Sequence, residues 1–163
     1  MELKEADTLA LGRFILSTFP EDEIERLFSE MEKQSIIGWR RKPSFDFILK
    51  VICQVMEVDI KRVKGRSRNA PLPLTRQLYI YLSMKIYYPE YMESLKRVKS
   101  LRLYAPEGAR MKVVSLINRN QTYVNNSVFR ISNYTHVDPK LCRDIEYLER
   151  VIYNEFKAQS EKE

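Results

Sequence analysis

The sequence predicts an all-helical fold for this chain of 163 residues, and two observations carry that prediction. Glycine occurs only four times. Apolar residues recur at spacings of three and four positions, the periodicity of helices packed on a core, and strands are hard to place anywhere. The hydrophobic content of 44% argues against a disordered chain, and the length suits one domain with a real core.

The first 43 residues predict an acidic helical extension followed by a linker. Leu3–Phe19 and Pro20–Ile37 are expected to be helices, and Gly38 closes this pair. The basic segment Trp39–Pro43 disfavours a helix before its proline and is interpreted as a boundary. The extension offers a surface that a protein partner could bind, with an apolar stripe of Ile24, Leu27, Phe28 and Met31.

Residues 44–158 are predicted to form the main domain, which starts with a core helix. Ser44 can cap this helix, which is expected to reach about Val58 because apolar residues repeat at helical spacing along it. Asp59 can cap a short helix that ends at Lys64. The apolar face of the core helix consists of Ile48, Val51, Ile52, Val55 and Val58.

Two prolines precede the next predicted helix. Pro71 and Pro73 are expected to hold the loop extended, so that the helix begins near Leu74 and runs to Tyr88. Arg76, Gln77 and Ile80 are expected on the faces of this helix that point away from the core. The predicted buried stripe consists of Leu74, Leu78, Tyr81, Leu82 and Ile86.

The region after Tyr88 predicts two further helices. Glu90–Tyr104 is expected to be helical with its lysines and arginines exposed. Pro106 can start a helix that runs through Ile117. The inward side chains of this second helix are expected to be Met111, Val114 and Ile117.

A turn and two more helices complete the predicted domain. Residues 118–122, NRNQT, supply the turn, and Asn120 can cap a helix over about Gln121–Thr135 that buries Val124, Val128 and Ile131. Asp138 and Pro139 together predict the start of a last helix. Residues 159–163 are expected to be a frayed tail. The stripe of the last helix consists of Leu141, Ile145, Leu148, Ile152 and Phe156.

Basic charge is concentrated in the middle of the chain. Residues 38–76 carry ten basic and three acidic side chains, and residues 77–137 carry nine and three. Residues 1–37 are acidic, with four against nine, and residues 138–163 have five against seven. This asymmetry within a net charge of +6 indicates either a polyanion bound at the centre of the fold or a solvated basic surface. The polyanion is the simpler interpretation.

No residue pattern indicates catalysis, a cofactor or a metal. His136 is the only histidine, and the chain has neither a GxxxxGK[ST] loop nor a GxGxxG turn. Cys53 and Cys142 lack metal-ligand spacing and are interpreted as buried thiols of a reducing compartment. No apolar run approaches the roughly 20 residues that span a bilayer. We therefore expect a cytoplasmic protein that is not an enzyme and has no evident small-molecule substrate.

DNA recognition needs groups that hold phosphates and groups that read base edges, and the sequence offers candidates for both in separate segments. Residues 63–77, VKGRSRNAPLPLTRQ, place basic side chains in a loop that runs into a helix. Residues 119–125 open a helix with amide and hydroxyl groups, which suit a major groove, although Asn120 can equally serve as a plain cap. The predicted DNA-binding residues are Lys64, Arg66, Ser67, Arg68, Arg76, Gln77, Arg119, Asn120, Gln121, Thr122, Tyr123 and Asn125.

These segments resemble the C-terminal DNA-binding domain of the bacterial chromosomal replication initiator DnaA, a Trp-repressor-like helix-turn-helix fold. The resemblance spans about Ser44 to Phe156 in unchanged order: a core helix, a short helix, the KGRSR loop, the TRQLYIYL helix, and RNQTYVNNSVFRIS followed by an acidic helix. It implies that an arginine of the basic loop enters the minor groove and that Arg76 and Gln77 contact DNA. It also implies that Arg119–Tyr123 opens the recognition helix.

The chain departs from that family at several positions. Asn120, Gln121 and Tyr123 stand where the family has aspartate, histidine and threonine, so the base preference should shift. Extra residues around Glu90–Ala109 lengthen the path between the two DNA-contacting segments. The phosphate loop of the initiator's ATPase module is missing. We therefore expect a standalone or mobile-element relative that binds double-stranded DNA in replication initiation or its regulation, without ATPase activity, and associates with the nucleoid.

An alternative interpretation is a non-catalytic adaptor that keeps the fold and binds a protein instead of DNA. Five tyrosines within thirteen residues motivate it, namely Tyr79, Tyr81, Tyr87, Tyr88 and Tyr91. The same tyrosines could instead line the core. A third interpretation, RNA binding, predicts a preference for single strands or A-form helices, which the amide-rich helix start does not suggest.

Overall fold

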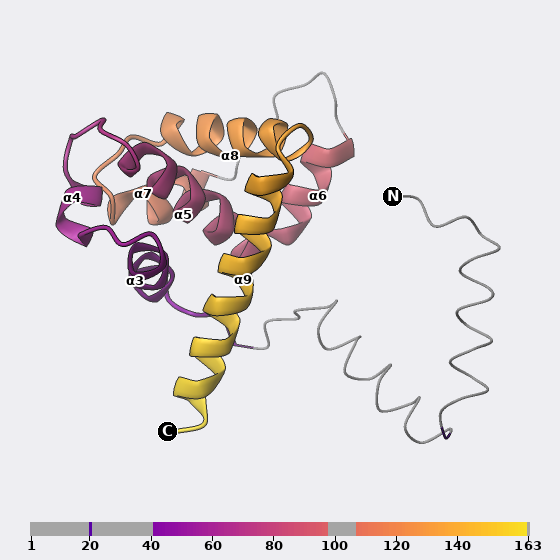
Figure 1. Cartoon of the computed structure of the whole chain (residues 1–163). Coiled ribbons are helices and arrows are strands. Elements are labelled where there is room, and N and C mark those ends of the chain that lie inside the picture. Colours follow the sequence, from indigo (N-terminus) through magenta and orange to yellow (C-terminus); the bar gives the residue numbers. More distant parts are fainter. Residues whose placement is uncertain (1–19, 21–40, 98–106, 163) are drawn as a thin grey trace. The chain divides into compact units, whose positions relative to one another are not determined.

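The computed structural model describes residues 20, 41–97 and 107–162 (Figure 1). The chain divides into two units, Met1–Arg40 and Arg41–Glu163, and the fold described here belongs to the second. The two helices predicted before residue 38 and the second half of the helix predicted over Glu90–Tyr104 lie outside the described residues.

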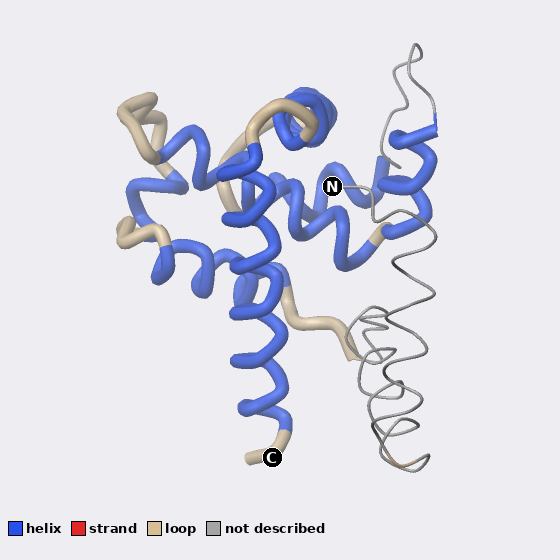
Figure 2. The backbone as a smooth tube through the Cα atoms, turned by 45° about the vertical axis from the view of Figure 1, so that its right-hand side comes forward, coloured by secondary structure: helices blue, strands red, loops and turns tan. Residues whose placement is uncertain are grey.

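The described residues contain helices and connecting loops and no strand (Figure 2), which confirms the all-helical prediction for this part of the chain. The long helix α9 leads to the C-terminus, and α8 precedes it across a short turn (Figure 1). The helices are α3 Phe45–Val55, α4 Ile60–Lys64, α5 Leu72–Tyr87, α6 Pro89–Arg97, α7 Glu107–Ser115, α8 Thr122–Thr135 and α9 Pro139–Ser160.

The caps predicted for α3 and α4 are both present. Ser44 Oγ accepts a hydrogen bond from the backbone N–H of Phe47 at 3.1 Å, and the Asp59 carboxylate caps α4 in the same manner. Helix α3 ends at Val55, earlier than predicted. The reason lies in the following turn, where Glu57 adopts a φ of 55° that a right-handed helix excludes.

Helix α5 forms the centre of the domain, because α3, α4, α6, α7, α8 and α9 all pack against it. Tyr79 is fully buried, and its hydroxyl donates to the Val113 carbonyl of α7 at 3.0 Å. Lys85 Nζ lies 2.6 Å from Glu149 Oε2, and this ion pair joins α5 to α9. A helix enclosed by neighbours in this way buries residues around most of its circumference.

The enclosure of α5 corrects the stripe predicted for it. Leu78, Leu82 and Ile86 are buried as predicted. Leu74, however, is 38% exposed, and Tyr81 is only half-buried. Ile80 and Arg76, both predicted to face away from the core, are buried. The one-sided stripe failed because helices cover α5 on several sides.

The start of α5 also differs from the prediction. The helix begins at Leu72, so Pro73 lies in its first turn and not in an extended loop. Proline is tolerated there because the first N–H groups of a helix have no carbonyl partner within it. The loop between α4 and α5 is correspondingly shorter than expected.

The buried face predicted for helix α7 is correct except at Met111. Met111 was expected to point inward but is 57% exposed, whereas Val114 and Ile117 are buried as predicted. Ala109 and Val113 are also buried, although the predicted stripe did not include them. The helix also ends at Ser115, before the predicted end.

Helices α8 and α9 match their predictions closely. Val124, Val128 and Ile131 of α8 are buried. Asp138 caps α9, since its Oδ1 accepts hydrogen bonds from the N–H groups of Lys140 at 3.0 Å and Leu141 at 3.2 Å. Helix α9 continues to Ser160, so the predicted frayed tail at 159–163 begins too early. Its buried residues are Leu141, Ile145, Leu148 and Ile152, and Phe156 is half-buried.

The two cysteines differ in burial, which corrects the prediction that both are buried. Cys53 is buried in α3, and Cys142 of α9 is half-buried. Burial raises the pKa of the Cys53 thiol to about 11, with the charge of Asp59 adding to the rise and that of Lys64 opposing it. The Cys53 thiol is therefore neutral at physiological pH.

Candidate nucleic-acid interface

The basic loop, residues 65–71 between α4 and α5, presents the arginines that the sequence assigns to phosphates. Arg66, Ser67 and Arg68 are exposed, and Lys64 at the end of α4 is half-buried. No ion pair joins Arg66 or Arg68 to another described residue. Ser67 Oγ accepts a hydrogen bond from the Asn69 N–H at 3.3 Å, which uses this hydroxyl to shape the loop.

Arg76 holds the basic loop from inside the protein instead of facing outward as predicted. Its side chain is 2% exposed. Nε donates to Val63 O at 2.7 Å, and Nη1 donates to Ser67 O at 2.7 Å. Nη2 donates to Arg62 O at 3.1 Å and to Gly65 O at 3.0 Å. Because these four bonds use most of the guanidinium's donors, Arg76 supports the loop that carries the exposed arginines.

The basic loop contacts the turn between α7 and α8, which lies 54 residues away in the sequence. Arg119 Nη2 donates to Gly65 O at 2.7 Å, and Asn118 Nδ2 donates to Lys64 O at 3.4 Å. The Gly65 carbonyl thus accepts hydrogen bonds from both Arg119 and Arg76. Burial, and secondly the charge of Arg119, lowers the pKa of Arg76, although an arginine remains charged at physiological pH. Loop and turn therefore form one connected surface.

The predicted site residues at the start of α8 differ in role: some make contacts within the protein, and others are exposed. Asn120 Oδ1 accepts a hydrogen bond from the Tyr123 N–H at 3.2 Å, so this side chain serves as the cap. Tyr123 is half-buried, with the Arg119 guanidinium 5.9 Å from its ring centre. Gln121 is half-buried and Thr122 is exposed. Asn125, further along the helix, is half-buried.

The outward face of α8 extends well beyond the first turn that the sequence singled out. Thr122, Asn126, Phe129 and Asn133 are all exposed and lie at spacings of four, three and four, which places them in one line along the helix. Asn126, Phe129 and Asn133 were not among the predicted site residues. Extending the helical spacing from Thr122 through the rest of the predicted helix identifies them from the sequence.

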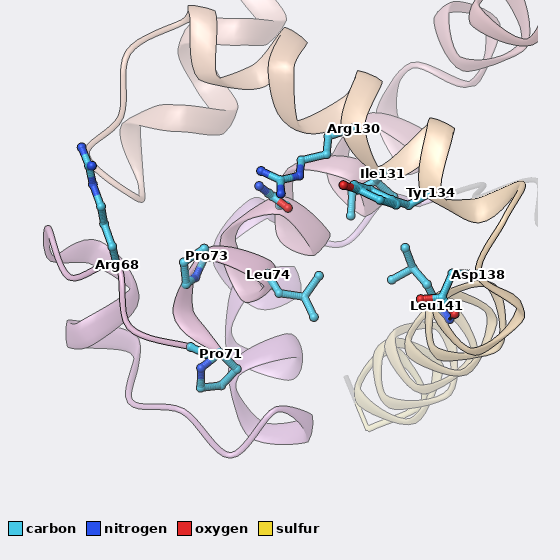
Figure 3. A pocket seen from close by; sticks show the side chains of 11 residues that line it. Arg68, Pro71, Pro73, Leu74, Arg130, Ile131, Tyr134, Asp138 and Leu141 are labelled. Atoms are coloured by element: carbon cyan, nitrogen blue, oxygen red, sulfur yellow. Dashed lines mark hydrogen bonds between the residues drawn. The ribbon is translucent and has the colours of Figure 1, made fainter.

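A groove of about 450 Å³ lies beside this face, between the first turn of α5, α8 and the start of α9 (Figure 3). Its lining is mainly apolar, with Leu74 and Tyr134 among the contributors. Arg68 comes from the basic loop and Arg130 from α8, and Gln77 of α5 also lines it. The guanidinium of Arg130 lies 5.6 Å from the ring centre of Tyr134. The groove therefore brings the predicted residues Arg68 and Gln77 together with Arg130, which the sequence reasoning missed.

Among the described residues, only Asp138 contributes a carboxylate to the lining of the groove. Its oxygen already accepts two backbone N–H bonds at the start of α9. The two arginines at the groove therefore face little opposing charge from the described residues. An extended polyanion beside an apolar wall, such as a phosphodiester strand with its sugars, suits this lining.

The tyrosines behind the adaptor interpretation do not form an exposed patch. Tyr79 is buried, and the other four are half-buried. The Tyr87 hydroxyl donates to Pro43 O at 2.6 Å, and the Tyr87 ring stacks on Phe45 at 4.2 Å. These contacts tie the end of the predicted linker to α5.

Within the described residues, no group of three or more His, Cys, Asp or Glu side chains could hold a metal ion. None of the helices in residues 41–97 and 107–162 has the length and apolar content needed to cross a bilayer.

Comparison of the chain with protein-family models, with curated proteins and with solved structures found no match.

Proposed function

We propose that this chain binds double-stranded DNA without catalysis, with α7 and α8 as a helix-turn-helix of the Trp-repressor type and the basic loop as a second contact. The observation that carries the proposal is the junction between the two segments. Arg119 and Asn118 donate to the carbonyls of Gly65 and Lys64, so the exposed arginines lie next to the polar start of α8. Phosphate contacts and base contacts would then reach one duplex together.

The proposed mechanism has two stages. Arg66 and Arg68 first attract the phosphate backbone and release counterions, which gives fast and salt-sensitive binding to any duplex. Helix α8 then enters the major groove, where the exposed Thr122 and the half-buried Gln121 read base edges. Arg130 and Gln77 at the groove hold one strand from the side. By this reading, Arg76, Arg119 and Asn120 position the loop, the turn and the helix start, and the target differs from that of the initiator family.

This proposal also gives the chain a role in replication initiation or its regulation, in the nucleoid. The resemblance of KGRSR, TRQLYIYL and RNQTYVNNSVFRIS to the DnaA C-terminal domain supports that role.

Fluorescence anisotropy tests the proposal. A labelled random-sequence duplex and a duplex that carries the initiator's DNA box are titrated with the full chain at several salt concentrations. We expect both duplexes to bind, with an association constant that falls steeply as the salt concentration rises. The slope of the logarithm of this constant against the logarithm of the salt concentration should be about −0.9 for each phosphate contacted. Equal binding to both duplexes supports the proposed change of target. Tighter binding to the box contradicts that change and indicates that the family's code survives Asn120 and Gln121. Absence of binding to either duplex at low salt contradicts the proposal.

A further inference from the structure

Phe129 occupies the outward face of α8, opposite the side that packs in the core. Successive residues of a helix are rotated by about 100°, so Thr122, Asn126 and Phe129 fall within a narrow strip. Val124, Val128 and Ile131 lie on the other side and are buried. Phe129 is 51% exposed and therefore contributes little to the core.

Its neighbours on the strip make Phe129 chemically distinct. Thr122, Asn126 and Asn133 offer hydroxyl and amide groups, which recognise base edges by hydrogen bonds. Phe129 offers only an apolar ring. In the major groove, the one apolar group that a base pair presents is a methyl group on C5 of a pyrimidine, and phenylalanine is among the side chains that contact it.

We propose that Phe129 is a specificity-determining residue that contacts the C5-methyl group of a pyrimidine in the major groove. This inference rests on the proposed function, because it requires α8 to lie in that groove. The methyl group belongs to thymine in unmodified DNA and to 5-methylcytosine in methylated DNA. Phe129 thereby distinguishes base pairs that carry the methyl group from those that lack it.

The helix geometry places this contact at a defined distance from the other reading residue. Phe129 follows Thr122 by seven residues, which corresponds to about 10.5 Å along a helix axis. Base pairs rise by about 3.4 Å each. The methyl-bearing pair therefore lies about three base pairs from the pair that Thr122 reads, when α8 follows the groove direction.

The experiment starts by selecting bound duplexes from a random-sequence pool with the full chain. The selected duplex is then prepared in two forms, one with thymine and one with deoxyuridine at each thymine position in turn. Deoxyuridine keeps the base pairing and removes only the methyl group. We expect one position at which the substitution weakens binding by about fourfold, the effect of exposing one methyl-sized group.

A set of variants assigns that effect to the side chain. Phe129→Ala should bind the thymine and deoxyuridine forms equally, and Phe129→Leu should recover part of the discrimination because it restores apolar contact. Tyr147→Ala is the matched control, since Tyr147 is an exposed aromatic residue on α9. It should discriminate as the unchanged chain does. Because Phe129 is half exposed, its variants should fold, which circular dichroism checks.

A third duplex separates the two sources of the methyl group. It carries cytosine or 5-methylcytosine, paired with guanine, at the sensitive position. Tighter binding to the 5-methylcytosine form supports contact with the methyl group itself. Equal binding to these forms and to the thymine and deoxyuridine forms overturns the inference but leaves DNA binding intact. A selection that enriches no sequence overturns it as well, and failure to bind any duplex overturns it together with the proposed function.

Discussion

Replacing Arg76 by methionine tests whether a buried guanidinium holds the basic loop in shape. Arg76 donates four hydrogen bonds to backbone carbonyls at distances between 2.7 and 3.1 Å. A hydrogen bond to a charged group contributes about 1.5 to 3 kcal/mol to the free energy of unfolding. Loss of all four would therefore cost at least about 6 kcal/mol if no water molecule replaced Arg76 at any of the carbonyls. Arg62 and Ser67 are exposed, so their carbonyls regain water when the loop opens. The Gly65 carbonyl keeps its hydrogen bond from Arg119, so the bond to the buried Val63 carbonyl sets the loss, about 1.5 to 3 kcal/mol in the free energy of unfolding.

Urea unfolding measures this loss, and amide hydrogen exchange reports where it arises. We expect faster exchange at residues 65–69 in Arg76→Met, because their carbonyl anchors are gone. Arg143→Met is the matched control, since Arg143 is an exposed arginine of α9, and its unfolding free energy should stay within about 0.5 kcal/mol of the original. A change below about 0.5 kcal/mol in Arg76→Met, or unchanged exchange in the loop, would refute the reasoning.

DNA binding separates the supporting role of Arg76 from a direct phosphate contact. Arg76→Lys keeps the charge but cannot reach four carbonyls with one ammonium group, so the loop loses its shape. We expect weaker binding at every salt concentration with an unchanged salt slope. Arg68→Ala should instead reduce the slope by about 0.9. If Arg76→Lys binds DNA as tightly as the original chain, the supporting role is wrong, because a lysine can replace an arginine at a direct phosphate contact but not as a donor to four carbonyls.

Four smaller predictions accompany this one. Thr122→Ala should reduce discrimination between sequences while leaving the salt slope of anisotropy titrations unchanged, because Thr122 carries no charge and the proposed mechanism assigns it to a base edge. Asn120→Asp should keep the cap of α8 and the thermal midpoint, whereas Asn120→Ala should lose about 1 kcal/mol in urea unfolding. Asp138→Ala should lose a similar amount, since its carboxylate accepts two N–H bonds at the start of α9. The pKa of the Cys53 thiol is about 11 in the folded protein, against an ordinary value of 9.0. The folded state therefore favours the neutral thiol, and its contribution to the free energy of unfolding is fully present below pH 9 and is lost as the pH rises towards 11. Urea titrations from pH 8 to 11 should therefore show a decline that is smaller in Cys53→Ala; native Cys53 should also react with iodoacetamide far more slowly than Cys142.

Helix starts with a capping side chain were the most predictable feature, because local chemistry determines them. Ser44, Asp59 and Asp138 each accept backbone N–H bonds at the helix starts that the sequence predicted. Such a bond depends on residues two or three positions away, so no tertiary information is needed. The same holds for Asn120, whose sequence position fits both a cap and a base contact and whose side chain accepts the Tyr123 N–H. The end of α3 was less predictable, since it depends on the left-handed turn at Glu57.

The candidate site was predictable in composition and only partly in geometry. The exposed Arg66, Arg68 and Thr122 occupy the positions expected from charge and from the helix start. Arg76 does not, because arginine at a helix start has the same sequence signal whether it faces water or buried carbonyls. Arg130 was not predicted, because the sequence pattern singled out only the first turn of α8 and Arg130 lies two turns further along. It reaches the groove only because α8 packs beside α5.

The sequence by itself therefore determined the helical class, the helix starts that have a capping side chain, and the concentration of basic charge, all of which follow from spacing, capping and composition. The tertiary structure decided which sides of the helices are covered: it buried Ile80 and Arg76 and left Met111 exposed. It also decided that the basic loop meets the α7–α8 turn through Gly65 and Arg119. Contacts across 54 residues of chain have no local signal, because they depend on how α5 orients every helix packed around it.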